Sequence, residues 1–478
     1  MIKKLSWIWG GINILVIVVV LNIILSNFPN LKIDLTKSKI HSLSPTTKNF
    51  IKNVDDIIQI KVYLTEDLPS EVKELKTGLK TILKDISNLN SKNIKVTYVD
   101  PNKDEAAKTE VQKEGIQPLQ FSSVNSDKFQ VQNGYFGLVM SYGDKKEVLP
   151  VAGDVGNLEY FVVSGIKKLI TKESPVIAYC EQASNNVSAT TILKKYLGDS
   201  YKIETVLLNG DSKLPESAKV LLIVGNTTEI DTKGQEKIKE WIKNGKGIIA
   251  LLDKYEVDNT VKAKENIDTG LEKIFSENGM EIEKKIVSDN EGTITSFSTN
   301  NGSFLVKYQY WPQIRAENID QSIPALSGLS SLNFMWASSI KVSDPAVKII
   351  SSSQHAQATE AKDLSPTVEQ ENSVGEKIAM GAINIKDGKK MALIADSDFI
   401  KDNFVVNNQQ NLALVLNLVD YFNQDNSLMG IRSKSITSYP LVEVGDNLRV
   451  WIKVINIGLP LLLLIGTGVI INVYRKKK

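Results

Sequence analysis

The sequence predicts a mixed α/β protein with a transmembrane helix at each end. Uncharged apolar stretches cover residues 5–31 and 454–474. Each is long enough to cross the roughly 30 Å hydrocarbon core of a bilayer. Between them, short apolar runs alternate with segments whose apolar residues recur at helical spacing. That alternation is typical of strands covered by amphipathic helices.

Basic residues flank both apolar stretches on their outer sides. Lys3 and Lys4 precede the first, and a basic tail at 475–478 follows the second. The positive-inside rule then predicts a two-pass protein of the plasma (inner) membrane, with both termini cytoplasmic and the bulk extracytoplasmic. A cleaved signal peptide is the alternative for residues 1–31. Residues 26–30 lack a small-x-small cleavage pattern, which favours an uncleaved anchor.

Composition limits the classes of function. The 478 residues carry 57 basic and 55 acidic side chains, a net charge of +2 that gives no bulk attraction to nucleic acid. Cys180 is the sole cysteine, so an intrachain disulfide is excluded and stability must come from packing. The length between the anchors suffices for two or three domains with their own cores.

Residues 32–173 are predicted to form the first domain. Ser44-Pro45 is typical of a helix N-cap followed by proline at the first helical position. Helices are expected at 45–51, 69–89, 103–114 and 158–170, and strands at 57–64, 94–99, 129–131, 136–142 and 147–151. This order matches a thioredoxin-like sandwich. The sequence has no Cys-x-x-Cys, which excludes the redox chemistry of that fold and leaves a scaffold or peptide-contact role.

Residues 174–430 are predicted to form a second, Rossmann-like domain. Strands are expected at 175–179, 201–208, 220–224 and 247–252, with helices at 189–197 and 232–243. Nearly continuous apolar strands alternating with amphipathic helices predict a parallel sheet that is covered on both faces. Strands at 378–385 and 390–395 and a helix at 411–422 complete the domain.

A less regular insertion is expected at about 255–376. It contains a helix at 271–278, an aromatic segment at 308–312 and a polar stretch at 351–373 that is typical of a mobile loop. The aromatic segment could stack on a sugar or peptide, but core packing is favoured. Residues 431–453 are expected to be a juxtamembrane segment leading to the helix at 454–474 and the tail at 475–478.

Polar residues follow the predicted strands where such folds bind ligands. Glu181, Asn226 and Asp253 follow three of them, and Asp396 and Asp398 follow a fourth. Because the carboxyl ends of parallel strands meet at one edge, these side chains define a possible ligand crevice. Asp396 and Asp398 could bind a divalent cation. The favoured interpretation is that they cap turn and helix donors instead.

The residues predict no catalytic group and no cofactor. A Cys180 nucleophile would need a base, and the two histidines lie next to the first anchor and in the polar loop (His41 and His355), so a buried structural cysteine is favoured. Two histidines and one cysteine fall short of a structural zinc site. The segment 225–228 lacks the lysine of a P-loop, so this chain is not itself a P-loop ATPase.

Several motifs together resemble a known family. They are Asp34-Leu35-Thr36 and Ser42-Leu43-Ser44 after the first anchor, Ala395-Asp396-Ser397-Asp398-Phe399, and Gly430-Ile431-Arg432. With the pattern of 220–253 and the final anchor, they resemble GldG-type, gliding-motility-associated auxiliary subunits of ABC transporters. The resemblance implies a glutamine-amidotransferase-like and intraflagellar-transport-type α/β fold, and partnership with a separate permease and a cytoplasmic ATPase. Cys180-Glu181-Gln182-Ala183 departs from the Gly-His-Gly-Glu often found there.

The leading hypothesis is therefore a non-enzymatic, substrate-binding-like subunit of an ABC-type transport or motility complex. Its extracytoplasmic body would contact an unknown substrate or envelope component and would be coupled to the permease and ATPase through the two anchors. One alternative is an envelope hydrolase or metal-dependent enzyme using Asp396 and Asp398. Another is a stand-alone adhesion or sensing module that binds through the aromatic insertion.

Overall fold

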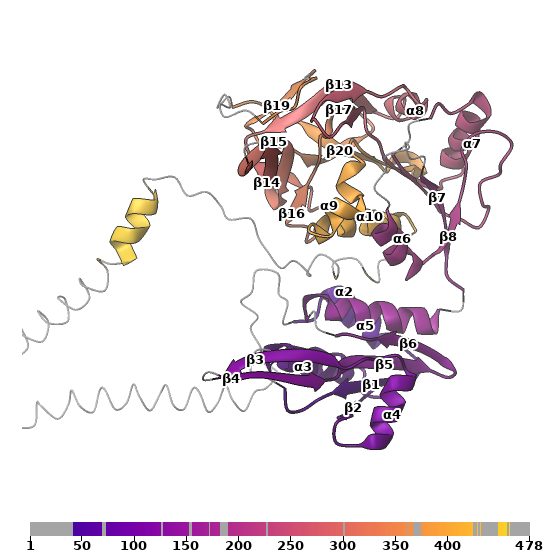
Figure 1. Ribbon diagram of the computed structural model, residues 1–478. Helices are drawn as coiled ribbons and strands as arrows, with labels where there is room; N and C mark the ends of the chain where they lie inside the picture. The colour runs from indigo at the N-terminus through magenta and orange to yellow at the C-terminus, as the bar shows by residue number, and fades with distance from the viewer. Residues whose placement is uncertain are drawn as a thin grey trace, which may run out of the picture. The chain divides into compact units, whose positions relative to one another are not determined.

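The computed structural model describes residues 42–68, 73–125, 128–152, 155–171, 173–181, 190–225, 228–299, 302–360, 362–366, 374–423, 428, 431, 448–456 and 458 (Figure 1). The chain divides into two compact units, Met1–Thr437 and Ser438–Lys478. The predicted anchor at 5–31, and all of 454–474 except 454–456 and 458, lie outside the described residues. Among the residues that are described, no helix combines the length and apolar character needed to span a bilayer.

The first part of the larger unit is built on a four-stranded sheet in the order β2-β1-β5-β6. β1 pairs in parallel with β2 and antiparallel with β5. The helices are α2 (Pro45–Lys52), α3 (Lys73–Leu89), α4 (Glu105–Lys113) and α5 (Val155–Ile170), and the strands are β1 (Ile58–Leu64), β2 (Ile94–Val99), β5 (Phe136–Tyr142) and β6 (Lys145–Leu149). A separate ribbon joins β3 (Leu119–Asn125) to β4 (Lys128–Gly134).

Apolar alternation in β1 assigns its two faces. Ile58, Ile60, Val62 and Leu64 pack with α2, α3 and α5 in the main core of this domain. Tyr63 lies on the opposite face in a smaller cluster with Val111 of α4. Because side chains alternate along a strand, the seven residues of β1 supply both cores.

The second part is built on a seven-stranded sheet in the order β18-β20-β21-β10-β9-β7-β8. Its strands are β7 (Val176–Glu181), β8 (Lys202–Thr205), β9 (Val220–Val224), β10 (Gly247–Leu251), β18 (Val347–Ser351), β20 (Ala379–Asn384) and β21 (Lys390–Ile394). The five strands from β8 to β21 are parallel, and β20 and β18 extend the sheet in antiparallel fashion. The chain order of the parallel strands reverses between β7 and β9, which defines the topological switch point.

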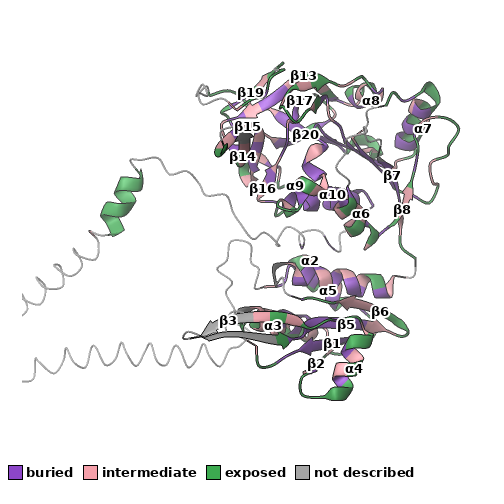
Figure 2. Cartoon of the chain, in the orientation of Figure 1, coloured by how far each residue is buried: buried purple, intermediate pink, exposed green. Residues whose placement is uncertain are grey.

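This sheet is buried on both faces, as Figure 2 shows for β7 and β20. On one face lie α6 (Thr191–Gly198) and α10 (Gln409–Phe422), packed on residues such as Leu222 and Ile249. On the other lie α7 (Thr232–Lys243) and α8 (Leu271–Ser276), packed on residues such as Leu221 and Ile248. Continuous apolar strands are the consequence of this double coverage. The mixed α/β class predicted from the sequence is confirmed.

The region between β10 and β20 is more regular than the sequence indicated. It forms three small antiparallel sheets, β11-β12, β17-β13-β19 and β14-β15-β16. Their strands are β11 (Tyr255–Val257), β12 (Ala263–Glu265), β13 (Met280–Asp289), β14 (Gly292–Thr299), β15 (Gly302–Arg315), β16 (Ser331–Asn333), β17 (Ser338–Val342) and β19 (Ala356–Thr359). The prediction of a mobile loop at 351–373 is wrong for residues 356–359, because they form β19 and pair with β13. β18, which also falls in this region, is an edge strand of the main sheet.

Helix α10 joins the region between β10 and β20 to the turn after β21. Its Asn411 is fully buried and accepts from the backbone N–H of Asn333 at 3.1 Å. The Asn411 amide donates to the carbonyl oxygens of Asn333 at 2.8 Å and of Phe399 at 3.0 Å. One side chain thus joins α10, β16 and the turn after β21. A buried polar residue is tolerated here because each of these polar groups finds a partner.

Replacing Asn411 with alanine should destabilise the chain by roughly 3 kcal/mol, because three backbone groups lose their partner in a buried setting. Denaturant unfolding of the purified full chain measures this change. Asn407→Ala is the matched control, since Asn407 is exposed, and it should shift stability by less than about 0.5 kcal/mol. Equal effects of the two substitutions would contradict the anchoring role.

Candidate functional site

Three carboxylates converge where β10 and β21 end. Asp253 follows β10, and Asp396 and Asp398 follow β21. One oxygen from each lies within 4.8 Å of the others. The two strands are paired in parallel, so their carboxyl ends are adjacent. Of the five crevice residues predicted from the sequence, the structure brings these three together.

Asp396 is the most buried of the three, with 1% of its surface exposed. One oxygen accepts from the backbone N–H of Met335 at 2.6 Å. The other accepts from the N–H of Asp398 at 2.7 Å and of Phe399 at 3.1 Å. Asp396 therefore fixes the turn into the short helix η5 (Asp398–Ile400) and ties it to the segment before β17.

Asp253 is held by Ser397. The Ser397 backbone N–H donates to one Asp253 oxygen and its hydroxyl donates to the other. Gly225, at the end of β9, has φ +58°, and a Cβ there would lie 2.9 Å from the Ser397 hydroxyl oxygen. Glycine is thus required both by the left-handed backbone and by the close approach of Ser397. The Ser397 side chain fills the space between Gly225 and Asp253.

Asp398 is paired with Lys401, one turn further along the chain. The Asp398 side chain is 13% exposed and the Lys401 side chain 23%. A lysine ammonium that is mostly removed from water needs a counter-charge, and the carboxylates supply it. Lys401 is therefore an internal cation of this cluster.

The crowding of charge shifts the proton affinities of these groups. Burial, reinforced by the charge of Asp398, raises the pKa of Asp253 to about 7. Burial and the neighbouring charges of Asp253 and Asp398 raise the pKa of Asp396 well above its usual range. Burial acts to lower the pKa of Lys401, but the charges of Asp398 and Asp253 outweigh it, so the pKa lies above the ordinary value. The cluster therefore favours a protonated carboxyl group beside a charged lysine.

These contacts decide what the cluster can do chemically. Carboxylate oxygens are suitable ligands for Mg²⁺ or Ca²⁺. Here, however, Asp396 and Asp253 already accept backbone and hydroxyl donors, and Lys401 already provides a cation. A divalent ion would have to displace Lys401 and compete with those donors. The favoured sequence interpretation was that Asp396 and Asp398 both cap turn and helix donors. Asp396 does accept from backbone N–H groups of the following turn, whereas Asp398 pairs with Lys401.

The side chains of the other two predicted crevice residues fall outside the described part of the chain. Glu181 ends β7, but its side chain lies outside the described residues, as does the whole of Asn226. Along the sheet, β9 lies between β7, which Glu181 ends, and β10, which Asp253 follows. Cys180 is fully buried, as expected of a structural cysteine. His355 lies at the turn before β19, and His41 is outside the described residues.

Two partners of the cluster were not predicted from the sequence. Lys401 stands three residues after Asp398, a spacing that brings side chains together on a helical turn, so the pairing had a local signal. Met335, which donates to Asp396, lies 61 residues away and had none.

The aromatic segment at 308–312 belongs to the core. Tyr308 is fully buried and donates to the carbonyl oxygen of Leu364 at 2.7 Å. Trp311 packs edge-on against Trp336 and Phe404, with ring centroids 5.5 and 5.3 Å away. The interpretation that these rings pack internally agrees with the structure.

The structure is therefore an α/β body in which the carboxylate cluster holds together the segments that follow β10 and β21. A family model described as an ABC-type uncharacterized transport system matches residues 174–426, more than half of the chain. The chain belongs to this family of ABC transport auxiliary proteins. A second model, described as a domain of unknown function, matches residues 37–141.

Individual proteins share little sequence identity with this chain. An uncharacterized protein of Borreliella burgdorferi is 26% identical over 321 residues, which cover 65% of this chain and 61% of that protein. The chain thus matches about three fifths of that relative's length. The mmIFT52 N-terminal domain is 13% identical with a TM-score of 0.37, over 52% of this chain and 96% of that one. A glutamine amidotransferase of Thermotoga maritima is 8% identical with a TM-score of 0.29, over 52% and 99%.

The raised pKa of Asp253 predicts a pH-dependent stability. A carboxyl group whose pKa rises on folding from 3.8 to about 7 stabilises the folded state fully below about pH 4, and this contribution is lost as the pH rises through 7. Asp253→Asn should therefore flatten the decline in unfolding free energy between pH 4 and 7, by on the order of 1 kcal/mol per pH unit.

Denaturant unfolding of the full chain across this pH range measures the slope. Asp387→Asn is the control, because Asp387 is exposed in the turn before β21 and should leave the slope unchanged. A slope that is the same in wild type and Asp253→Asn would show that Asp253 ionises normally in the folded state.

Proposed function

We propose that this chain is the non-catalytic, extracytoplasmic auxiliary subunit of an ABC-type export or gliding-motility complex. Membership of the ABC transport auxiliary family across residues 174–426 is the observation that carries the proposal. In such a system a separate permease and a cytoplasmic ATPase provide the pathway and the energy. This chain contributes a folded body that contacts substrate, envelope or another subunit.

The chemistry of the carboxylate cluster supports a non-catalytic role. A general acid or base needs a titratable group that can reach a substrate. Asp396 is buried and bonded to three backbone donors, and Asp253 is covered by Ser397. These groups hold the ends of β10 and β21 together and leave binding to the outer surface of the body.

The two apolar ends support a membrane-anchored arrangement. The stretches at 5–31 and 454–474 have the length and flanking charge of spanning helices. In the smaller unit, residues 448–456 are helical and expose Leu448, Val450 and Trp451. This exposed helix also carries Arg449 and Lys453 and leads directly into a predicted anchor, which fits a continuous helix entering the membrane with Trp451 at the interface.

A metal-dependent envelope enzyme is the second candidate, and the convergence of Asp253, Asp396 and Asp398 is the observation that favours it. Under that alternative, Ca²⁺ or Mg²⁺ should raise the melting temperature of the full chain, and Asp398→Asn should abolish the rise. Under our proposal neither ion shifts the wild type, because Lys401 already pairs with Asp398 and protein donors already occupy Asp396 and Asp253. Thermal melting with and without each ion separates the two.

The main proposal is tested by purifying the tagged full chain from native membranes in a mild detergent. We expect a multi-spanning permease and an ATPase to co-elute with it. A variant truncated after residue 447 lacks the C-terminal helix and should lose both partners while its body stays folded. Recovery of the full chain alone, from membranes in which both proteins are present, would contradict the proposal.

A further inference from the structure

Helix α5 connects parts of the chain that are far apart in sequence. One face packs on its own sheet through Leu158, Val162 and Ile166, spaced four residues apart. The other side carries Asn157, Glu159, Tyr160 and Val163, which contact α2, α6, α10 and residues 428 and 431. Of these segments, only α2 belongs to the first domain.

The segment that follows the predicted N-terminal anchor is fixed to α5. Glu159 is 4% exposed, and its carboxylate accepts from the backbone N–H of Ser44 at 2.7 Å. Ser44 is the N-cap of α2, with its hydroxyl accepting from the N–H of Thr47. Phe50, further along α2, packs beside Tyr160 and Val163. A buried charge-assisted hydrogen bond at a helix start is a firm attachment.

The segment that leads toward the C-terminal anchor is fixed to the same helix. Leu428 and Ile431 are 0% and 1% exposed, and both pack against Tyr160 and Val163 of α5. These two residues lie between α10 and the smaller unit in the chain order. Both ends of the body therefore meet on one face of α5.

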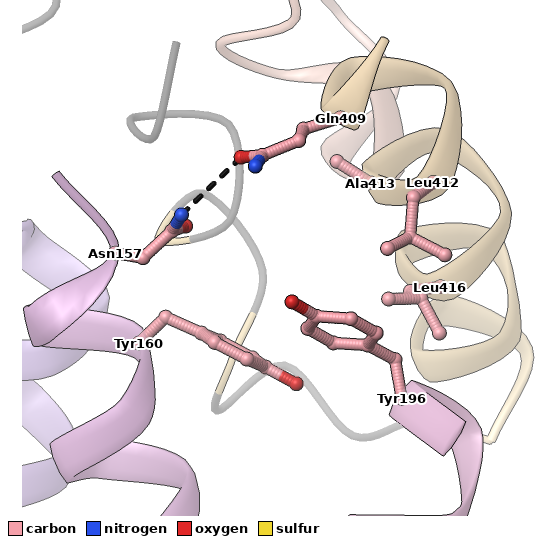
Figure 3. Close-up of a pocket in the computed structure, with 7 residues that line it drawn as sticks. All are labelled: Asn157, Tyr160, Tyr196, Gln409, Leu412, Ala413 and Leu416. Carbon is pink, nitrogen blue, oxygen red and sulfur yellow. Dashed lines mark hydrogen bonds between the residues drawn. The ribbon is translucent and has the colours of Figure 1, made fainter. Parts of the chain in front are cut away.

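Within the described part of the chain, α5 also meets the part built on the seven-stranded sheet (the second domain) through a small, partly polar contact. Figure 3 shows Asn157 bonded to Gln409 of α10, and Tyr160 beside Tyr196 of α6. The hydrogen bond between the two side-chain amides is exposed and 3.2 Å long, and the centroids of the two rings are 6.3 Å apart. A cavity of about 30 Å³, bounded further by Leu412 and Leu416, separates the helices. An incompletely packed, partly polar contact is easier to rearrange than a close-packed core.

We propose that α5 is the coupling element of the body: it receives movement from both membrane-linked segments, and the α5–α6/α10 contact is where the second domain reorients. This inference rests on the proposed function, because it takes the two ends as anchors worked by an ATPase. The attachments at Ser44 and at Leu428 and Ile431 are tight, whereas the contact across the cavity is loose. Movement of either end therefore changes the relation between the domains before it disturbs either core.

The test measures the distance between the domains in the full chain. Spin labels are placed on Lys113→Cys in α4 and Glu236→Cys in α7, both exposed, in a Cys180→Ala background that removes the sole native thiol. Distances are recorded in lipid nanodiscs, without partners. Ile431→Asp, which expels one attachment from α5, should broaden the distance distribution. Val406→Asp, on an exposed side chain of the second domain, should leave it unchanged.

Glu159→Ala and Glu159→Gln test the other attachment. The alanine variant loses the acceptor for Ser44 and should broaden the distribution, whereas the glutamine variant keeps an oxygen there and should stay closer to wild type. If Ile431→Asp fails to fold, Ile431→Ser replaces it. Distributions of folded Ile431 and Glu159→Ala variants that superimpose on wild type would overturn the inference, whatever the chain's partners are.

A second arm uses the purified complex with its ATPase. We expect ATP to shift the distance in wild type, and Ile431→Asp to abolish that shift while the permease and ATPase still co-purify. A shift that persists unchanged in this variant would overturn the role of α5. Failure of co-purification counts against the proposed function itself, and the partner-free measurement then decides the inference alone.

Discussion

The buried carboxylate of Asp396 is the interaction on which the second domain depends. A charged or polar group removed from water must find partners, and Asp396 finds three backbone N–H groups, two in the turn that follows it and one at the distant Met335. It thereby fixes the turn after β21 and joins the inserted sheets to the edge of the main sheet. Ser397 then reaches Asp253, and Lys401 pairs with Asp398, so the arrangement extends from Gly225 at the end of β9 to Lys401 after η5.

This constraint gives the acidic cluster of this ABC transport auxiliary protein a structural role. Its oxygens are occupied by donors from the protein itself, so the carboxyl edge is a structural joint. Under the proposed function, binding and mechanical coupling then fall to the surfaces of the body and to its connections. Helix α5, where segments near both ends of the body attach, is the connection we consider most informative.

Much of this was predictable from the sequence, and the failures have physical causes. The strands β9 and β10 were predicted because a doubly covered strand must be apolar throughout. The strand at 129–131 was predicted and lies in β4, but β3 was missed and β14–β15 were left irregular, because polar strands carry little periodic signal. Asp396 was singled out by its place after a strand, but its bond to Met335 depends on a chain reversal that no local pattern encodes.

We propose an extracytoplasmic body that is worked from the other side of the membrane. Measuring on which side of the membrane each part of the chain lies tests this proposal most directly. In a Cys180→Ala background, Lys233→Cys places a thiol on exposed α7, and Lys477→Cys places one in the basic tail. We expect a membrane-impermeant maleimide, given access to the outer face of the plasma membrane, to label position 233 in intact cells and position 477 only after that membrane is opened. Protection of position 233 until lysis would contradict the account.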